Sequence, residues 1–146
     1  MNASGPIQIR IFSQPAHLPV VRSAVEKFCG ALGFDSEMAG RIVLAVDEAL
    51  TNIIRHAYEG RGDQHIDIEL SSLGAQKPGG LRICLRDYGK GVSASEIKSR
   101  DLDRVRPGGL GVHIMNTCMD SVEYKPSGGG TELTLVKYLP ALKDQP

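Results

Sequence analysis

Three glycines at the start of a helical pattern have a spacing that suggests phosphate binding. Gly108, Gly109 and Gly111 lie in RPGGLGVHIMNTCMD, where a loop leads into a helix expected from about Leu110 to Met119. Such a junction exposes backbone N–H groups and the positive end of the helix dipole, so it can bind an anion. Residues 98–106 add four cations against two acidic residues. A solvated loop that uses glycine as a hinge explains the same pattern, and both interpretations stay open.

A carboxylate at the end of an apolar strand is the second candidate. Asp87 continues the inward row of LRICLRD, and an inward carboxylate costs free energy unless a group donates to it. Gly89 and Gly91 follow, and glycines at this spacing let a backbone approach a flat or charged ligand closely. Thr131 shares the strand face of the leucines in TELTLVKYL, so its hydroxyl also points inward. A simple turn that begins at Asp87 remains the alternative interpretation.

A glutamate and an asparagine four residues apart form the third candidate. At about 100° per residue, Glu48 and Asn52 in VDEALTNIIRHAY share one polar face of an expected helix, and the opposite face is apolar. Most amphipathic helices carry such residues for solubility, and from this helix alone that interpretation is favoured.

Alternating strands and helices must position these residues. The patterns predict a strand in IQIRIFS, a helix from Leu18 to Leu32 that stops at Gly33, and a long helix capped by Asp35 or Ser36. They also predict half-buried strands in HIDIEL and LRICLRD, and a hairpin of SVEYK and TELTLVKYL around the glycines at 128–130. Strands with one solvated face and few helices indicate a two-layer α/β sandwich.

Composition limits the classes of function. The 146 residues fit one domain, 1–146, and 17 basic against 17 acidic residues give no basic field for nucleic acid or anionic membranes. Three separated cysteines and four scattered histidines suggest neither a disulfide framework nor a zinc site. No signal peptide and no apolar run of membrane-spanning length is found. We expect a soluble intracellular protein without a direct nucleic-acid or membrane partner.

Four short motifs, taken in chain order, resemble the N, G1, G2 and final boxes of the GHKL (Bergerat-fold) ATPases. They are Glu48-x-x-x-Asn52, Asp87-x-Gly89-x-Gly91, Gly108-Gly109-Leu110-Gly111 and Gly129-Gly130-Thr131. Within that superfamily DEALTNIIRHAY, GGLGVHIMNTCMDSVEY and GGGTELTLVKYL are similar to segments of the anti-sigma-factor serine/threonine protein kinases. The resemblance covers nearly the whole chain. It implies an α+β fold, with a mixed, mostly antiparallel sheet and helices on one face.

The resemblance also implies a role for each motif. Asp87 would accept a hydrogen bond from the adenine amino group of ATP, with Thr131 beside it, and Asn52 would be an oxygen ligand of Mg²⁺. Glu48 would be the general base, and Arg106 would contact the γ-phosphate. The other implied nucleotide-binding positions, which include the lid over the phosphates, are Gly89, Gly91, Gly108, Gly109, Leu110 and Gly111.

The function that the resemblance implies is an ATP-dependent serine kinase in the bacterial cytoplasm. It would phosphorylate a STAS-type anti-anti-sigma partner, sequester a sigma factor in transcriptional stress responses, and form a homodimer. Two alternatives stay open, a nucleotide-responsive binding module that transfers no phosphate and a stand-alone histidine-kinase-like ATPase.

Overall fold

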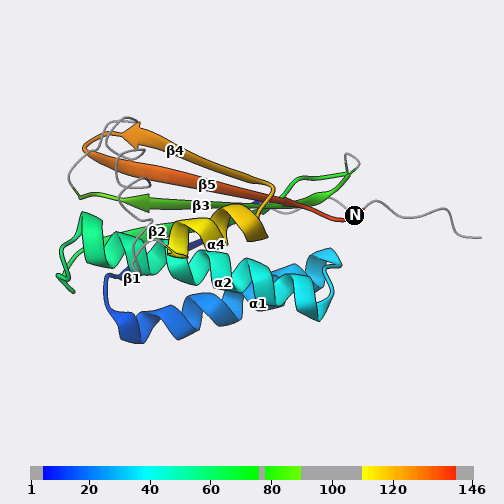
Figure 1. The fold of residues 1–146 in the computed structure, drawn as a ribbon, viewed down its shortest axis with the longest axis horizontal. Coiled ribbons are helices and arrows are strands. Elements are labelled where there is room, and N and C mark those ends of the chain that lie inside the picture. Colours follow the sequence, from blue (N-terminus) through cyan, green and yellow to red (C-terminus); the bar gives the residue numbers. More distant parts are fainter. Residues whose placement is uncertain (1–4, 76–77, 90–109, 141–146) are drawn as a thin grey trace, which may run out of the picture.

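The chain folds into two layers, a five-stranded sheet and a layer of helices that covers one of its faces (Figure 1). The computed structural model describes residues 5–75, 78–89 and 110–140, apart from the side chains of residues 110–112. The elements in chain order are β1 (Ile7–Phe12), η1 (Pro15–His17), α1 (Leu18–Leu32), α2 (Ser36–Asn52), η2 (Ile53–Ala57), β2 (His65–Ser72), β3 (Gly80–Asp87), α4 (Leu110–Cys118), β4 (Ser121–Ser127) and β5 (Gly130–Tyr138).

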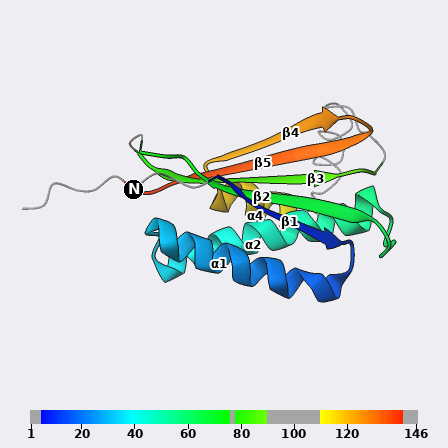
Figure 2. The same ribbon diagram turned by 180° about the vertical axis from the view of Figure 1, so that it is seen from behind.

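The sheet has the strand order β1-β2-β3-β5-β4, and each neighbouring pair is antiparallel. The expected α+β sandwich is thereby confirmed, with a more regular sheet than the mixed one that the resemblance implied. β4 and β5 form an antiparallel hairpin, and β5, not β4, lies beside β3. β4 runs parallel to β3 but lies at the edge of the sheet, so the described strands contain no parallel pair. From behind, α1, α2 and α4 still lie on one side of the sheet (Figure 2).

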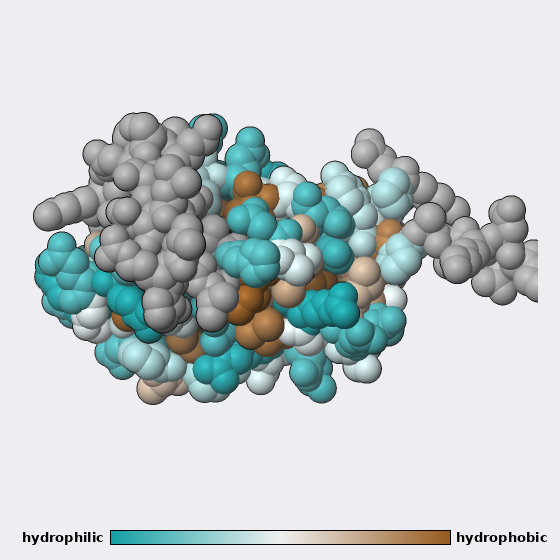
Figure 3. All heavy atoms as spheres, in the orientation of Figure 1, coloured by the Kyte–Doolittle hydropathy of each residue, from teal (hydrophilic) through white to brown (hydrophobic). Residues whose placement is uncertain are grey.

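The core lies between the two layers and follows the expected alternation. The inward residues of β2 and β3 are fully buried, as are those of α1 and α2 that face them. These core residues include Val21, Val25, Ile42, Val46, Leu50, Ile66, Ile68, Leu70, Leu81, Ile83 and Leu85. On the side shown in Figure 3, the described surface is mostly hydrophilic, with separate apolar patches. None of the described helices is long and apolar enough to cross a membrane.

The helix boundaries follow the capping signals of the sequence. Gly33 ends α1 with φ +103°, a left-handed conformation that favours glycine, and the Phe34 N–H donates to the Cys29 carbonyl at 3.0 Å. Asp35 caps α2, because its carboxylate accepts the Met38 N–H at 2.8 Å. The two caps fix the turn between the helices, and therefore the axis along which α2 carries Glu48 and Asn52 across the sheet.

The expected long helix is not regular up to Tyr58. After Asn52 it widens into the π-helix η2, where the Tyr58 N–H donates to the Ile53 carbonyl at 3.0 Å, five residues back. A π turn holds more residues than an α turn, so the residues after Asn52 leave the angular positions of a 100° spacing. Ile53 and Ile54 stay buried, and Tyr58 turns inward.

The cap of α2 can be tested by replacing Asp35 with alanine. The Asp35→Ala protein should lose about 1 kcal/mol of unfolding free energy, because the Met38 N–H loses its acceptor. Urea unfolding measures this change. Ser36→Ala, at an exposed neighbouring position, is the matched control and should stay within about 0.5 kcal/mol of the unchanged protein. Equal unfolding curves for Asp35→Ala and its control would contradict the assignment of the cap.

Candidate functional site

Two polar side chains are buried where β3 ends and β5 begins. Asp87 is the last residue of β3 and lies opposite Thr131 of β5. Their exposures are only 4% and 8%, and in the described residues Ser13 is the only other buried polar residue. Asp87 Oδ1 accepts the Gly89 N–H at 3.1 Å. The inward orientation predicted for both side chains is confirmed, and a carboxylate and a hydroxyl therefore face the helix layer at this end of the sheet.

Two glycines let the backbone pack tightly around this pair. A Cβ at Gly130 would lie 1.9 Å from the Asp87 carbonyl oxygen, and a Cβ at Gly89 would lie 2.5 Å from that of Ala57. Neither distance is possible for a real side chain. The backbone after Asp87 therefore contacts β5 on one side and η2 on the other. Position 89 must be a glycine for the backbone to approach Ala57 this closely.

Glu48 and Asn52 lie on the last turns of α2, and both are partly buried. On the same helix Arg41 is exposed, and Arg55 of η2 is exposed as well. The polar face is thus solvated at its ends and partly covered where Glu48 and Asn52 lie. The Asn52 Nδ2 atom is buried and has no hydrogen-bond partner in the described residues. A buried amide nitrogen without an internal acceptor is a candidate donor to a ligand.

These groups fit a purine nucleotide with a hard metal ion. A buried carboxylate can accept from an exocyclic amino group, and an amide oxygen is a ligand type that Mg²⁺ accepts. No group of three His, Cys, Asp or Glu residues that could hold a metal is found in the described residues. A metal ion here would therefore need oxygens from its ligand as well as from Asn52. Mg²⁺ commonly binds in that way, through few protein groups together with phosphates and water.

The remaining predicted positions are only partly described. Gly91, Arg106, Gly108 and Gly109 lie outside the described residues. Leu110 and Gly111 belong to α4, whose described part runs from Leu110 to Cys118. The structure thus brings Asp87, Gly89 and Thr131 together at the end of the sheet. The phosphate-binding loop remains a prediction.

Tyr58 is a residue of this region that the sequence analysis did not identify. It is 3% exposed, its hydroxyl donates to the His65 carbonyl at 2.5 Å, and the Tyr88 N–H donates to that hydroxyl at 2.6 Å. Burial raises the pKa of Tyr58. A regular spacing of 100° per residue does not predict that Tyr58 is buried, because the π-helix η2 before it changes the direction of its side chain. The available signal was an aromatic residue with a polar tip at a helix end, which usually finds a partner when buried.

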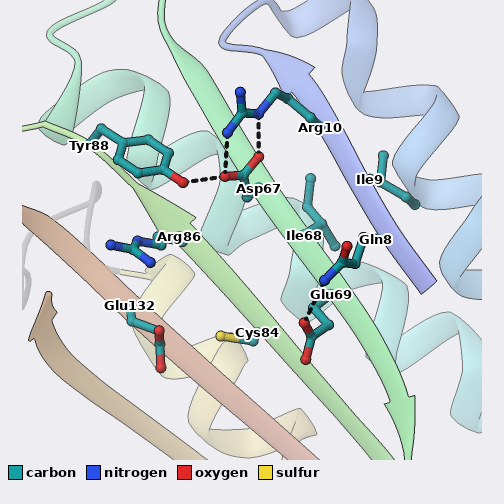
Figure 4. Close-up of a pocket in the computed structure, with 10 residues that line it drawn as sticks. All are labelled: Gln8, Ile9, Arg10, Asp67, Ile68, Glu69, Cys84, Arg86, Tyr88 and Glu132. Carbon is teal, nitrogen blue, oxygen red and sulfur yellow. Dashed lines mark hydrogen bonds and ion pairs between the residues drawn. The ribbon is translucent and has the colours of Figure 1, made fainter. Parts of the chain in front are cut away.

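A charged network covers the opposite face of the sheet beside the same strand end (Figure 4). Arg10 donates twice to Asp67, at 2.7 and 3.0 Å, and the Tyr88 hydroxyl also donates to Asp67. The hydrogen bonds from Arg10 lower the pKa of Asp67. The Arg86 guanidinium lies 5.2 Å from the centre of the Tyr88 ring. Tyr88 thus belongs to the outer face, and its neighbour Asp87 belongs to the inner one.

Comparisons with known proteins agree on one family. The model of the histidine kinase-like ATPase domain matches residues 11–137. The serine-protein kinase RsbW of Bacillus pumilus is 28% identical over 142 residues, which cover 91% of this chain and 85% of that protein.

Two solved structures share the fold. The RsbU and RsbW domains of a Mycobacterium tuberculosis protein align with a TM-score of 0.66 and 19% identity, over 94% of this chain and 34% of that one, so this chain spans about a third of it. The histidine kinase domain of a blue-light-activated histidine kinase from Erythrobacter litoralis aligns with a TM-score of 0.51 and 25% identity. That alignment covers 94% of this chain and 69% of the other.

The close packing at the strand end can be tested by Gly130→Ala. The new Cβ would overlap the Asp87 carbonyl oxygen, so β3 and β5 must separate at this end. We expect unfolding free energy to fall by about 1–3 kcal/mol, and the amide NMR signals of residues 87 and 131 to shift. Gly30→Ala is the matched control, since a Cβ there meets no atom within 4 Å and alanine is favoured in a helix. A Gly130→Ala protein as stable as the unchanged chain would contradict this packing.

Proposed function

Because the chain belongs to the histidine kinase-like ATPase domain family, we propose that it is an ATP-dependent serine protein kinase and anti-sigma factor. Its substrate is a serine of a STAS-type anti-anti-sigma partner, and it sequesters a sigma factor when that partner is not available. The similarity to the Bacillus pumilus serine-protein kinase, along 85% of that protein, supports this choice within the family.

One observation of the structure carries the proposal. Asp87 is 4% exposed and lies opposite Thr131. The resemblance of the four motifs assigns to Asp87 the hydrogen bond with the adenine amino group. A buried carboxylate is costly unless hydrogen bonds compensate it. Adenine offers one more donor through its amino group, and a ligand that supplies it gains affinity from a charged acceptor.

Each residue of the site has a separate role in the proposed reaction. Asp87 and Thr131 bind the base, and Asn52 would hold Mg²⁺ through its amide oxygen. Its unpartnered Nδ2 is left to donate to another group of the ligand. Bound Mg²⁺ neutralises charge on the phosphates. Glu48, one helical turn before Asn52, accepts the proton of the attacking serine hydroxyl. Gly91, Gly108, Gly109 and Gly111, with Arg106, enclose the phosphates.

The wider biological assignment belongs to the same proposal. Residues 1–146 act as one ATP-binding kinase domain in the cytoplasm of a bacterium, and two copies form a homodimer. The partners are the STAS-domain protein and the sigma factor, and neither DNA nor a membrane is bound directly.

A second candidate function is a stand-alone histidine-kinase-like ATPase. The similarity to the Erythrobacter litoralis histidine kinase domain, at 25% identity over 94% of this chain, favours it. The chemistry of the product separates the two candidates, because a phosphoserine survives acid and a phosphohistidine does not.

The first test removes the carboxylate proposed to bind adenine. Asp87→Ala should weaken Mg²⁺-dependent binding of ATP and ADP at least about 10- to 100-fold, the range expected for loss of a hydrogen bond to a charged group. Isothermal titration calorimetry on the folded variant measures this affinity. Glu26→Ala, which removes an exposed carboxylate of α1, is the control and should bind as the unchanged protein does. Unchanged affinity in folded Asp87→Ala would rule out the assigned role.

The second test removes the proton acceptor. A serine hydroxyl is a weak nucleophile at neutral pH, so Glu48→Gln should retain ATP affinity within a few-fold while transfer to a STAS partner falls about 10²–10⁴-fold. Transfer of label from γ-labelled ATP measures the rate. Glu37→Gln, on the exposed first turn of the same helix, should transfer at the rate of the unchanged protein.

Each other outcome has a clear meaning. If Glu48→Gln transfers phosphate as fast as the unchanged protein, Glu48 is not the general base but a polar residue of the helix surface. A label that acid removes would favour the histidine-kinase-like candidate. If no STAS protein is labelled although ATP and a sigma factor both bind, the chain is a binding module that transfers no phosphate.

A further inference from the structure

We propose that the Tyr58 hydroxyl is the positioning group that fixes Asp87 for recognition of adenine, so that Tyr58 sets the preference for ATP over a nucleotide without the amino group. This inference rests on the proposed function in one respect, namely that Asp87 reads the base. Tyr58 itself bonds the backbone of His65 and of Tyr88, on the two sides of the strand end.

The hydroxyl of Tyr58 is inserted into the ladder between β2 and β3. The antiparallel register pairs Ile66 with Asp87, so the next pair along the ladder would be His65 and Tyr88. The pairing stops there. Instead the Tyr88 N–H donates to the Tyr58 hydroxyl at 2.6 Å, and that hydroxyl donates to the His65 carbonyl at 2.5 Å. The side chain of Tyr58, the residue that follows η2, therefore separates the two strands at the residue after Asp87.

This separation determines where Gly89 lies. Once Tyr88 is held away from β2, the chain passes against η2, where a Cβ at Gly89 would lie 2.5 Å from the Ala57 carbonyl oxygen. The Gly89 N–H then donates to Asp87 Oδ1 at 3.1 Å. The orientation of the Asp87 carboxylate therefore depends on the two neighbouring residues Ala57 and Tyr58.

The outer face supplies a second attachment of Tyr88, with a different consequence. The Tyr88 side chain is exposed, and its hydroxyl donates to Asp67, which Arg10 also binds (Figure 4). Exposed ion pairs and their hydrogen bonds contribute little free energy. The bond from the Tyr88 N–H to the Tyr58 hydroxyl is part-buried, and Tyr58 itself is 3% exposed, so the loss of this bond is compensated less completely by water. The bond to Tyr58 is therefore the one that fixes Asp87.

Loss of the hydroxyl must displace the strand end. In Tyr58→Phe the ring can keep its place in the core, but the Tyr88 N–H and the His65 carbonyl lose their common partner. They can pair directly, which continues the ladder and draws Tyr88 toward β2, or they can turn to water. Either change moves Gly89 and the carboxylate that it holds.

The test compares ATP with inosine triphosphate, which carries an oxygen in place of the adenine amino group. Calorimetry is done with the unchanged protein, with Tyr58→Phe, and with Tyr138→Phe as a matched control at an exposed tyrosine at the far end of β5. In Tyr58→Phe the preference for ATP should fall about tenfold or more, the equivalent of one hydrogen bond to a charged group, while the affinity for inosine triphosphate stays within a few-fold. Tyr138→Phe should keep the full preference.

Three outcomes would overturn the inference. A full preference for ATP in folded Tyr58→Phe would show that the hydroxyl does not position Asp87. An equal loss for both nucleotides would show a purely structural role. If the unchanged protein itself does not prefer ATP, Asp87 does not read the base, and the proposed function fails together with this inference. The first two results leave the proposed function intact.

A second measurement needs no variant and no nucleotide. The bond to the Tyr58 hydroxyl predicts that the Tyr88 amide of the unchanged protein exchanges with solvent as slowly as amides inside β3, although Tyr88 lies beyond the strand. Hydrogen exchange followed by NMR measures this rate for a single residue. Exchange as fast as that of an exposed loop amide would overturn the inference, even if Tyr58→Phe does not fold.

Discussion

A carboxylate buried at the end of a strand is the constraint on which the arrangement of this protein depends. Asp87 can remain ionised inside the fold only if hydrogen bonds compensate the lost hydration. The sheet brings Thr131 opposite, and the turn after Asp87 returns the Gly89 N–H to the carboxylate. Glycines are required at 89 and 130 because the backbones on both sides approach too closely for a Cβ. The two glycines are thus fixed by close backbone packing around the buried carboxylate.

The helix layer completes this corner through an irregularity. A regular α-helix would continue the spacing that puts Val46 and Leu50 on the core, whereas η2 widens after Asn52. The π turn allows α2 to present Glu48 and Asn52 on one side and still turn Tyr58 toward the sheet. π turns are rare and often mark functional sites. Here the change of helical period has a specific consequence, because Tyr58 bonds the two strands whose ends it separates.

Much of the fold follows from short-range signals in the sequence. The alternation in β2 and β3, the end of α1 at Gly33 and the cap at Asp35 are all set by residues within a few positions, so the pattern predicts them. Alternation also predicts that Asp87 points inward. The π turn and the bonds of Tyr58 depend on contacts between η2, β2 and β3, which lie far apart in the chain, and no local pattern contains them. The ligand roles of the site came from family resemblance, since a buried carboxylate alone does not name its ligand.

Three titratable groups of this corner, Asp67, Tyr58 and Tyr88, keep their charge around neutral pH. The hydrogen bonds from Arg10 lower the pKa of Asp67 below its usual 3.8, so the stability that this pair contributes is present above that value and is lost as the pH falls through the lower, folded pKa. Burial raises the pKa of Tyr58, and the bond to Asp67 raises that of Tyr88, both from 10.0. Their contributions are complete below that value and are lost only as the pH rises through the higher, folded pKa. Between these limits none of the three groups changes its charge. Titration of these three groups therefore does not rearrange the strand end near neutral pH, whereas a ligand or partner can do so if it binds two arrangements with different affinity.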